Sequence, residues 1–375
     1  MRVLAINLII LVVLLSVLEG SFSALLMFQD GRLSSTEAVV RKMNILRQKK
    51  AAGQMSFDAR CSTMSSWQPA SPLTSHPKYG WWGKPSVESN LTIERQNGAS
   101  YTWKYSTTPW GSRITKRFSD YNSPSNKENP SPKIIILGDS QLNGWAVNDT
   151  ASMSFKIQTL LPDYEVINLS GSGFGTVQAF LILEDIKNGT FKENLLTKDK
   201  RLPEGSIVLL GFGPYYRVRN TFNKPWITTL RSFAECRPFF KSSNGIEFKY
   251  PDIRLLDNGD ISVSIFDLFS HHSFHNPSIA ENSMISMKLH EKIFDITEEL
   301  GADLAVMLLL GKDIPEVEFL RSKGARIIDA RQKRLIHQYD TLLPFDQHHG
   351  YLSHDTFANE FVDSLQKYIN STKSK

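Results

Sequence analysis

The residues KIIIL at positions 133–137 run directly into Gly138-Asp139-Ser140 and then into QLNGWAVNDT at 141–150. A short apolar run that ends in a turn is typical of a strand buried on both faces of a parallel sheet. A serine in the turn from such a strand into a helix lies at the carboxyl edge of the sheet, near the free N–H groups of the helix end. The stretch therefore predicts an α/β domain with Ser140 as a candidate nucleophile, although an Asp/Ser capping turn also explains these three residues alone.

The pattern that begins at 133 continues to the end of the chain. Further short apolar runs, interpreted as strands, lie at 165–169, 207–211, 304–310 and 326–328. Segments with helical spacing lie at about 152–161, 175–187, 282–299, 314–323 and 354–371. Strands that alternate with helices predict a mainly parallel, five-stranded, flavodoxin-like sheet over 131–372.

One insertion interrupts this alternation at about 217–280. Within it, the sequence IRLLDNGDISVSI at 253–265 predicts a hairpin around Asn258-Gly259, a strong short-range turn signal. We expect the insertion to shape or cover the site at the edge of the sheet.

The N-terminal part of the chain has a different character. The apolar run at 3–18 follows Arg2 and predicts a signal peptide or membrane anchor over 1–28, with an N-terminal core helix as the less favoured interpretation. Residues 30–130 form an irregular, aromatic-rich extension that ends in the polar, proline-containing linker SPSNKENPSP. Core packing explains its tryptophans and tyrosines better than stacking on sugar rings.

Composition and spacing argue against several classes of ligand. The net charge is +5, from 43 Lys and Arg against 38 Asp and Glu, and the charges are scattered, so we expect no nucleic-acid partner. The spacing of His271, His272 and His275 suits no common metal site, and Cys61 and Cys236 lie too far apart for a CxxC motif. We therefore expect no metal and no cofactor.

Two later segments also follow predicted strands. The glycine-rich SGSGFGT at 170–176 lacks the GxGxxG spacing of dinucleotide sites, but its glycines can turn backbone N–H groups toward a developing oxyanion. The second segment, Asp346-Gln347-His348-His349, precedes the last helix and can supply a base with its orienting carboxylate.

Together, GDS, NLSGSGFG and DQHH resemble the blocks of the GDSL/SGNH hydrolase superfamily. The resemblance implies a three-layer α/β/α SGNH fold with Ser140 as nucleophile, His349 as base and Asp346 as its partner. It also implies an oxyanion hole built from Ser140 and Gly173. The upstream HPKYGWWGKP at 76–85 is similar to bacterial envelope members that carry an N-terminal membrane segment.

Two departures from the family pattern leave choices open. The third block supplies an oxyanion-hole asparagine in the family, whereas this chain has GFGP at 211–214. Candidate substitutes are Asn143, Asn220, Arg217 and Tyr215. His348 is the alternative base, because two extra residues follow the histidine pair.

The expected function is therefore a serine ester hydrolase that acts outside the cytoplasm, on an acylated small molecule or polysaccharide. The resemblance implies that the reaction is O-acetyl ester hydrolysis or O-acyl transfer on a glycan. The alternative, favoured by the lost asparagine, is a non-catalytic SGNH-like module that binds a glycan or a protein.

Overall fold

The computed structural model describes residues 72–94, 100–122, 130–191, 195–221, 223–235, 241–242, 245–246, 249–267, 274, 276–309, 315–331 and 348–373. These residues belong to one compact unit, Met64–Lys375. No helix among them is long and apolar enough to cross a membrane. Several predicted features lie outside the described residues: the apolar segment at 3–18, Cys61, Cys236, His271, His272, His275 and Asp346.

The centre of the described structure is a five-stranded sheet in which every neighbouring pair of strands is parallel. Its spatial order is β13-β12-β7-β5-β6. The strands are β5 (Lys133–Leu137), β6 (Glu165–Asn168), β7 (Ile207–Phe212), β12 (Asp303–Leu308) and β13 (Arg326–Asp329). Counted along the chain this is the flavodoxin-like order 2-1-3-4-5, so the predicted sheet is confirmed, and its switch point lies between β5 and β7.

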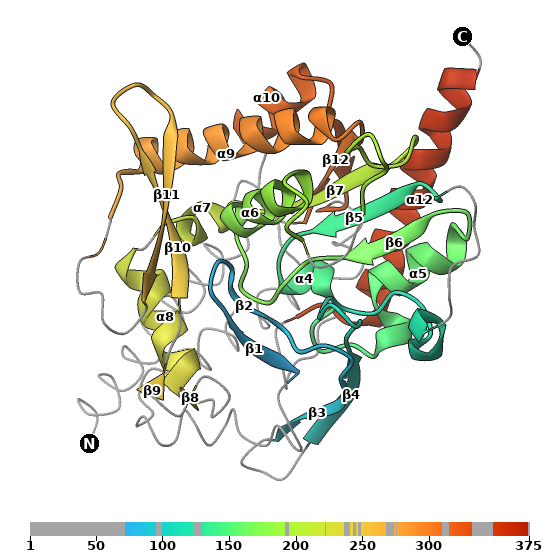
Figure 1. Ribbon diagram of the computed structural model, residues 1–375, viewed down its shortest axis with the longest axis horizontal. Helices are drawn as coiled ribbons and strands as arrows, with labels where there is room; N and C mark the ends of the chain where they lie inside the picture. The colour runs from blue at the N-terminus through green and yellow to red at the C-terminus, as the bar shows by residue number, and fades with distance from the viewer. Residues whose placement is uncertain are drawn as a thin grey trace, which may run out of the picture. The chain divides into compact units, whose positions relative to one another are not determined.

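Helices cover both faces of the sheet and make a three-layer α/β fold (Figure 1). Because side chains alternate along a strand, Ile134 and Ile136 share one apolar core while Ile135 and Leu137 share the other. The first core includes residues of α5 (Met153–Leu160) and α12 (Tyr351–Lys373). The second includes residues of α6 (Thr176–Lys187), α9 (Ile279–Glu299) and α10 (Pro315–Ser322).

The predicted helix boundaries hold to within a few residues, and local capping explains one of the differences. Helix α9 begins at Ile279 rather than near 282, because the side chain of Ser278 accepts a hydrogen bond from the N–H of Glu281. Helix α12 begins at Tyr351 rather than near 354.

The N-terminal extension was predicted to be irregular. Its described part instead forms two antiparallel hairpins. These are β1 (Leu73–His76) with β2 (Gly80–Gly83), and β3 (Glu88–Glu94) with β4 (Ser100–Ser106), followed by the 3-10 helix η2 (Phe118–Asn122). Trp81 and Trp103 are buried, as the core-packing interpretation expected. β1 and β2 have only four residues each, so their alternation is too brief to stand out in the sequence.

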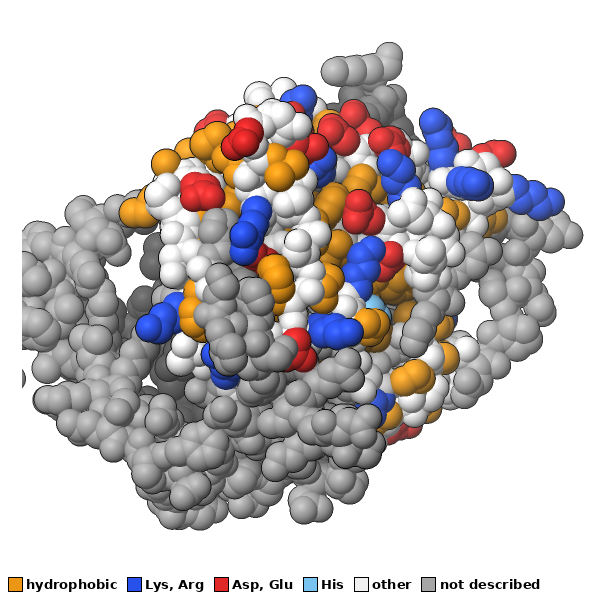
Figure 2. Space-filling view, turned by 60° about the vertical axis from the view of Figure 1, so that its left-hand side comes forward, with side chains coloured by type: hydrophobic (Ala, Val, Ile, Leu, Met, Phe, Trp, Pro, Cys, Tyr) orange, Lys and Arg blue, Asp and Glu red, His pale blue; other side chains and the backbone are white. Residues whose placement is uncertain are grey.

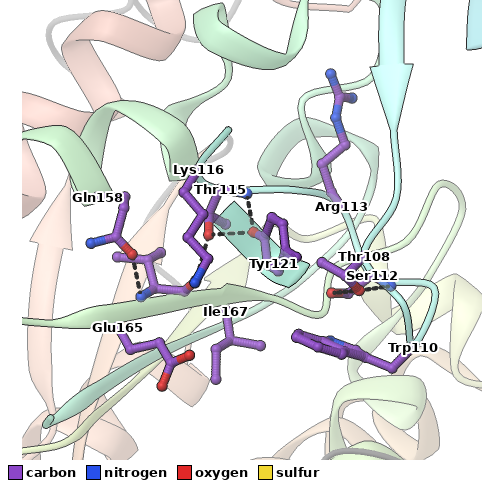
Figure 3. Close-up of a pocket in the computed structure, with 11 residues that line it drawn as sticks. Thr108, Trp110, Ser112, Arg113, Thr115, Lys116, Tyr121, Gln158, Glu165 and Ile167 are labelled. Atoms are coloured by element: carbon purple, nitrogen blue, oxygen red, sulfur yellow. Dashed lines mark hydrogen bonds between the residues drawn. The ribbon is translucent and has the colours of Figure 1, made fainter. Parts of the chain in front are cut away.

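The segment after β4 covers the outer edge of strand β6. Arg113 forms an isolated bridge with Asn168, and the hydroxyl of Thr115 donates to the carbonyl of Val166 at 2.6 Å. Figure 3 shows Thr115 and Tyr121 joined by hydrogen bonds beside a small cavity, while the side chain of Arg113 points away from it. This cover protects an edge that would otherwise offer free backbone groups to another strand.

The guanidinium of Arg113 holds the loop that follows the candidate nucleophile. Its Nε donates to Asp149 Oδ1 at 3.0 Å, and its Nη1 and Nη2 donate to the carbonyls of Gly144 and Val147 at 2.9 and 2.8 Å. Asp149 opens the 3-10 helix η3 (Asp149–Ala151) and also accepts from the N–H of Ser106 at 2.9 Å. The extension therefore braces the loop of the sheet domain.

The insertion after β7 contains short helices and two strand pairs. They are α7 (Tyr216–Arg219), α8 (Lys224–Glu235), β8 (Lys241–Ser242) with β9 (Gly245–Ile246), and β10 (Lys249–Leu255) with β11 (Ile261–Asp267). The last pair confirms the predicted hairpin, and its loop at 256–260 places Gly259 at a φ of 79°. On the face seen in Figure 2, basic side chains lie among acidic ones rather than in one patch.

The burial of Arg113 leads to a test of the bracing role. Its side chain is 0% exposed and that of Asp149 is 5% exposed. Arg113→Ala leaves a buried carboxylate without its cation, so we expect the free energy of unfolding to fall by about 3–5 kcal/mol in a denaturant titration. The control is Arg321→Ala, which breaks an exposed pair with Glu318 and is expected to cost less than about 1 kcal/mol. Equal losses in the two variants would contradict the bracing role.

Candidate active site

Ser140 lies in a tight turn at the carboxyl end of β5, as predicted. It begins the four-residue helix α4 (Ser140–Asn143), which Asp139 caps by accepting from the N–H of Gln141 at 3.0 Å. Gly144 ends the helix in the left-handed region at a φ of 75°. The side chain of Ser140 is largely enclosed, because the residue is only 6% exposed.

A histidine from the opposite end of the chain contacts this serine. The Nε2 atom of His348 lies 2.7 Å from Ser140 Oγ. The two residues meet because residues 348–350, which lead into α12, lie at the edge of the sheet where β5 ends. This distance is within the reach that a general base needs for the proton of a serine.

The histidine at this place is His348, and not His349 as expected. His349 is 2% exposed, and its ring packs edge-on against Phe357 of α12 with centroids 5.3 Å apart. Successive residues of a non-helical segment project in different directions, so only one of the pair can face Ser140. The expected orienting carboxylate, Asp346, lies outside the described residues.

A third histidine, His354, lies nearby on α12. It is buried, and its Nδ1 accepts from the N–H of Met153 at 3.2 Å. Burial, with a further contribution from the charge of His349, holds the pKa of His354 well below its usual range. His354 is therefore a neutral acceptor that joins α12 to α5.

The glycine-rich loop after β6 lies beside the nucleophile turn. The N–H of Gly171 donates to the carbonyl of Gly138 at 3.0 Å. Gly173 has a φ of 78°, and a Cβ at this position would lie 2.9 Å from the indole of Trp81. Glycine is therefore required at 173, both for its backbone conformation and for the close approach of the β2 hairpin.

The loop after β7 contains Tyr215, one of the predicted substitutes for the missing asparagine. The ring of Tyr215 lies over Gly213, so closely that a Cβ added at Gly213 would be 2.6 Å from the ring. Its hydroxyl donates to Asp139 Oδ2 at 2.9 Å. Burial and the charge of Asp139 raise the pKa of Tyr215 well above its usual range, so the hydroxyl stays protonated.

Two of the predicted substitute donors, Asn143 and Arg217, are engaged elsewhere. Asn143 donates to the carbonyl of Ser170 at 2.7 Å. Asn220 is held through its Oδ1, which accepts from the N–H of Val177 at 3.1 Å, while its buried Nδ2 donates to no group among the described residues. Arg217 forms a two-pronged ion pair with the buried Glu316, at 2.7 and 2.5 Å.

Sequence reasoning missed Arg219, which lies between the nucleophile turn and the glycine-rich loop. Its Nη1 is 3.0 Å from both Asp139 Oδ2 and the carbonyl oxygen of Phe174. Helical spacing could have identified it, since positions four apart share a helix face and Tyr215 and Arg219 are so spaced. By the same spacing, Arg217 projects from the opposite side of this short helix.

No protein-family model and no curated protein matches this chain. Among solved structures it is similar to a lipolytic protein of the G-D-S-L family from Veillonella parvula (10% identity, TM-score 0.36), which covers 62% of this chain and 97% of its own. It is also similar to the psychrotrophic esterase EstA from Pseudoalteromonas sp. (13% identity, TM-score 0.36; 64% and 98% covered) and to TesA (10%, 0.33; 63% and 98%). At these values the activities of the other proteins do not carry over to this chain.

The arrangement has the parts of covalent acyl chemistry: a hydroxyl, an imidazole in contact with it, and a glycine-rich loop alongside. Within the described ranges, no three His, Cys, Asp or Glu side chains are grouped so as to hold a metal ion.

The buried histidines predict how stability depends on pH. The folded-state pKa of His354 is below the unfolded value of about 6.5, so the unfolded chain binds more protons as the pH falls through that value. We expect the free energy of unfolding to fall between about pH 7 and pH 5. His354→Gln keeps an acceptor for Met153 and should reduce this slope in denaturant titrations. Part of the slope should remain in this variant, because the pKa of the buried His290 is also lowered by burial. An unchanged slope in the variant would show that His354 is not a source.

Proposed function

We propose that this protein is a serine ester hydrolase of the GDSL/SGNH type. The observation that carries the proposal is the 2.7 Å contact between Ser140 Oγ and His348 Nε2. It lies at the switch point of a flavodoxin-like sheet, the place where such folds bind their ligands. The resemblance of the GDS, NLSGSGFG and DQHH segments to the family supports the same conclusion.

In the proposed mechanism, His348 takes the proton of Ser140 while the serine oxygen bonds to the ester carbonyl carbon. The backbone N–H groups of Ser140 and Gly173 hold the oxyanion. When the carbon–oxygen bond of the leaving alcohol breaks, that alcohol takes the proton from His348. An acceptor hydroxyl then attacks the acyl-serine and gives its proton to His348. His348 passes this proton to Ser140 Oγ as the bond between the acyl carbon and the serine oxygen breaks.

The acceptor hydroxyl decides between two outcomes of one mechanism. Water gives ester hydrolysis, and a sugar hydroxyl gives O-acyl transfer. We propose an acyl group on a glycan outside the cytoplasm as the substrate, with Asp346 as the carboxylate that orients the base. The apolar run at 3–18 and the resemblance to envelope members support that location and an attachment to the membrane.

The first test asks whether Ser140 is the nucleophile. The purified protein is expected to hydrolyse p-nitrophenyl acetate and to be labelled at Ser140 by a fluorophosphonate, as read by mass spectrometry. Ser140→Ala should abolish labelling and lower turnover to the background rate. Full activity in this variant would exclude Ser140 as the nucleophile. A parent protein that neither turns over esters nor takes the label would favour the alternative, a non-catalytic binding module.

The second test separates the two adjacent histidines. His348→Gln removes the base and is expected to lower kcat roughly 10²–10⁴-fold while the melting temperature changes little. His349→Gln is the matched control, because the same substitution one residue later disturbs the buried contact with Phe357. It should lower the melting temperature with a smaller loss of kcat. The reverse pattern would return the role of base to His349.

A further inference from the structure

Arg219 contacts both loops that would form the oxyanion hole, although it contributes no backbone group to that hole. We infer that Arg219 is the positioning residue that holds the turn of Ser140 to the loop of Gly173, an inference that rests on the proposed function. It does so from the segment after β7, where the family's side-chain donor is missing.

The two acceptors of Arg219 are neighbours of the two proposed oxyanion donors. Asp139 immediately precedes Ser140, and Phe174 immediately follows Gly173. One nitrogen, Nη1, lies 3.0 Å from Asp139 Oδ2 and 3.0 Å from the carbonyl oxygen of Phe174. The cationic group of Arg219 therefore adds a link between the two loops, beside the hydrogen bonds from Gly171 to Gly138 and from Asn143 to Ser170.

Aromatic side chains hold the guanidinium in this place. Its central carbon lies 4.6 Å from the ring centroid of Tyr215 and 4.9 Å from that of Trp226. The backbone is anchored as well, because the carbonyl of Arg219 accepts from the hydroxyl of Tyr250 at 2.8 Å. Tyr250 in turn accepts from the indole of Trp226 at 2.8 Å. Arg219 is thus fixed at both ends, and its side chain is only 18% exposed.

The charge of Arg219 matters as much as its hydrogen bonds. Asp139 is 1% exposed and, besides Arg219, its carboxylate accepts from the hydroxyl of Tyr215 and the N–H of Gln141. Without Arg219 this buried carboxylate would form no ion pair with any of the residues that the structure describes. A negative charge next to Ser140 would then oppose the oxyanion that forms during acylation. We therefore expect that removing Arg219 lowers the rate of the reaction step and leaves the binding of a neutral ester unchanged.

The main experiment compares Arg219→Met with Arg219→Lys on p-nitrophenyl acetate. Arg219→Met keeps an apolar side chain but removes the cation, and it should lower kcat roughly 10²-fold with KM within about threefold. A lysine ammonium can donate to both acceptors from near the position of Nη1, so Arg219→Lys should recover about tenfold of this loss. The pH–rate profile should keep its shape, because the contact between Ser140 and His348 is untouched.

Two further variants test the cause of the loss. Arg217→Met is the matched control, because it also removes a guanidinium from a buried carboxylate. Arg217 lies on the other side of α7 and pairs with Glu316 of α10. This control should lower the melting temperature while kcat stays within about threefold of the parent. Asp139→Asn combined with Arg219→Met removes the uncompensated charge and should restore part of kcat. Equal kcat losses in Arg217→Met and Arg219→Met would overturn the inference, as would a wild-type kcat in Arg219→Met.

A measurement independent of turnover separates this inference from the proposed function. Amide hydrogen exchange at residues 171–174 should quicken in Arg219→Met and stay unchanged in Arg217→Met. Unchanged exchange in Arg219→Met would overturn the positioning role even if the parent protein is an active esterase. An inactive, unlabelled parent would instead refute the proposed function, while faster exchange would still show that Arg219 holds the loop.

Discussion

The parallel pairing of β5 with β6 on one side and β7 on the other is the constraint on which the site depends. Parallel strands bring their carboxyl ends to one edge, so segments from positions near 140, 172 and 215 meet although they are far apart in sequence. The chain order reverses between β5 and β7, and His348, just before α12, lies at that edge. The contact of Ser140 with His348 follows from this arrangement.

The residues before the sheet take part in the same arrangement. The β1–β2 hairpin brings Trp81 over Gly173, and the segment after β4 brings Arg113 to the loop that follows α4. The insertion adds Tyr250, whose ring stacks on Trp81 with centroids 6.1 Å apart. Elements outside the parallel sheet therefore support two of the loops at its edge.

The sequence alone predicted the sheet and the place of Ser140 at the end of β5. The strand at 133–137 was bounded correctly because a buried apolar run next to Gly138 and Asp139 has few other interpretations. The choice between His348 and His349 could not be made, because a loop has no periodicity to tell which of two neighbours faces the serine. Arg219 was missed, although helical spacing places it near Tyr215 once the short α7 is recognised.

The close packing of Trp81 against Gly173 has a practical consequence for work with fragments of this protein. A recombinant chain begun at 131 would contain every residue of the proposed reaction, yet it would expose the apolar face of Phe174, on which Trp81 and Trp82 pack. It would also uncover the outer edge of β6, a free surface for aggregation. The shortest fragment whose apolar core stays covered must therefore begin at residue 72 or earlier, before the first hairpin.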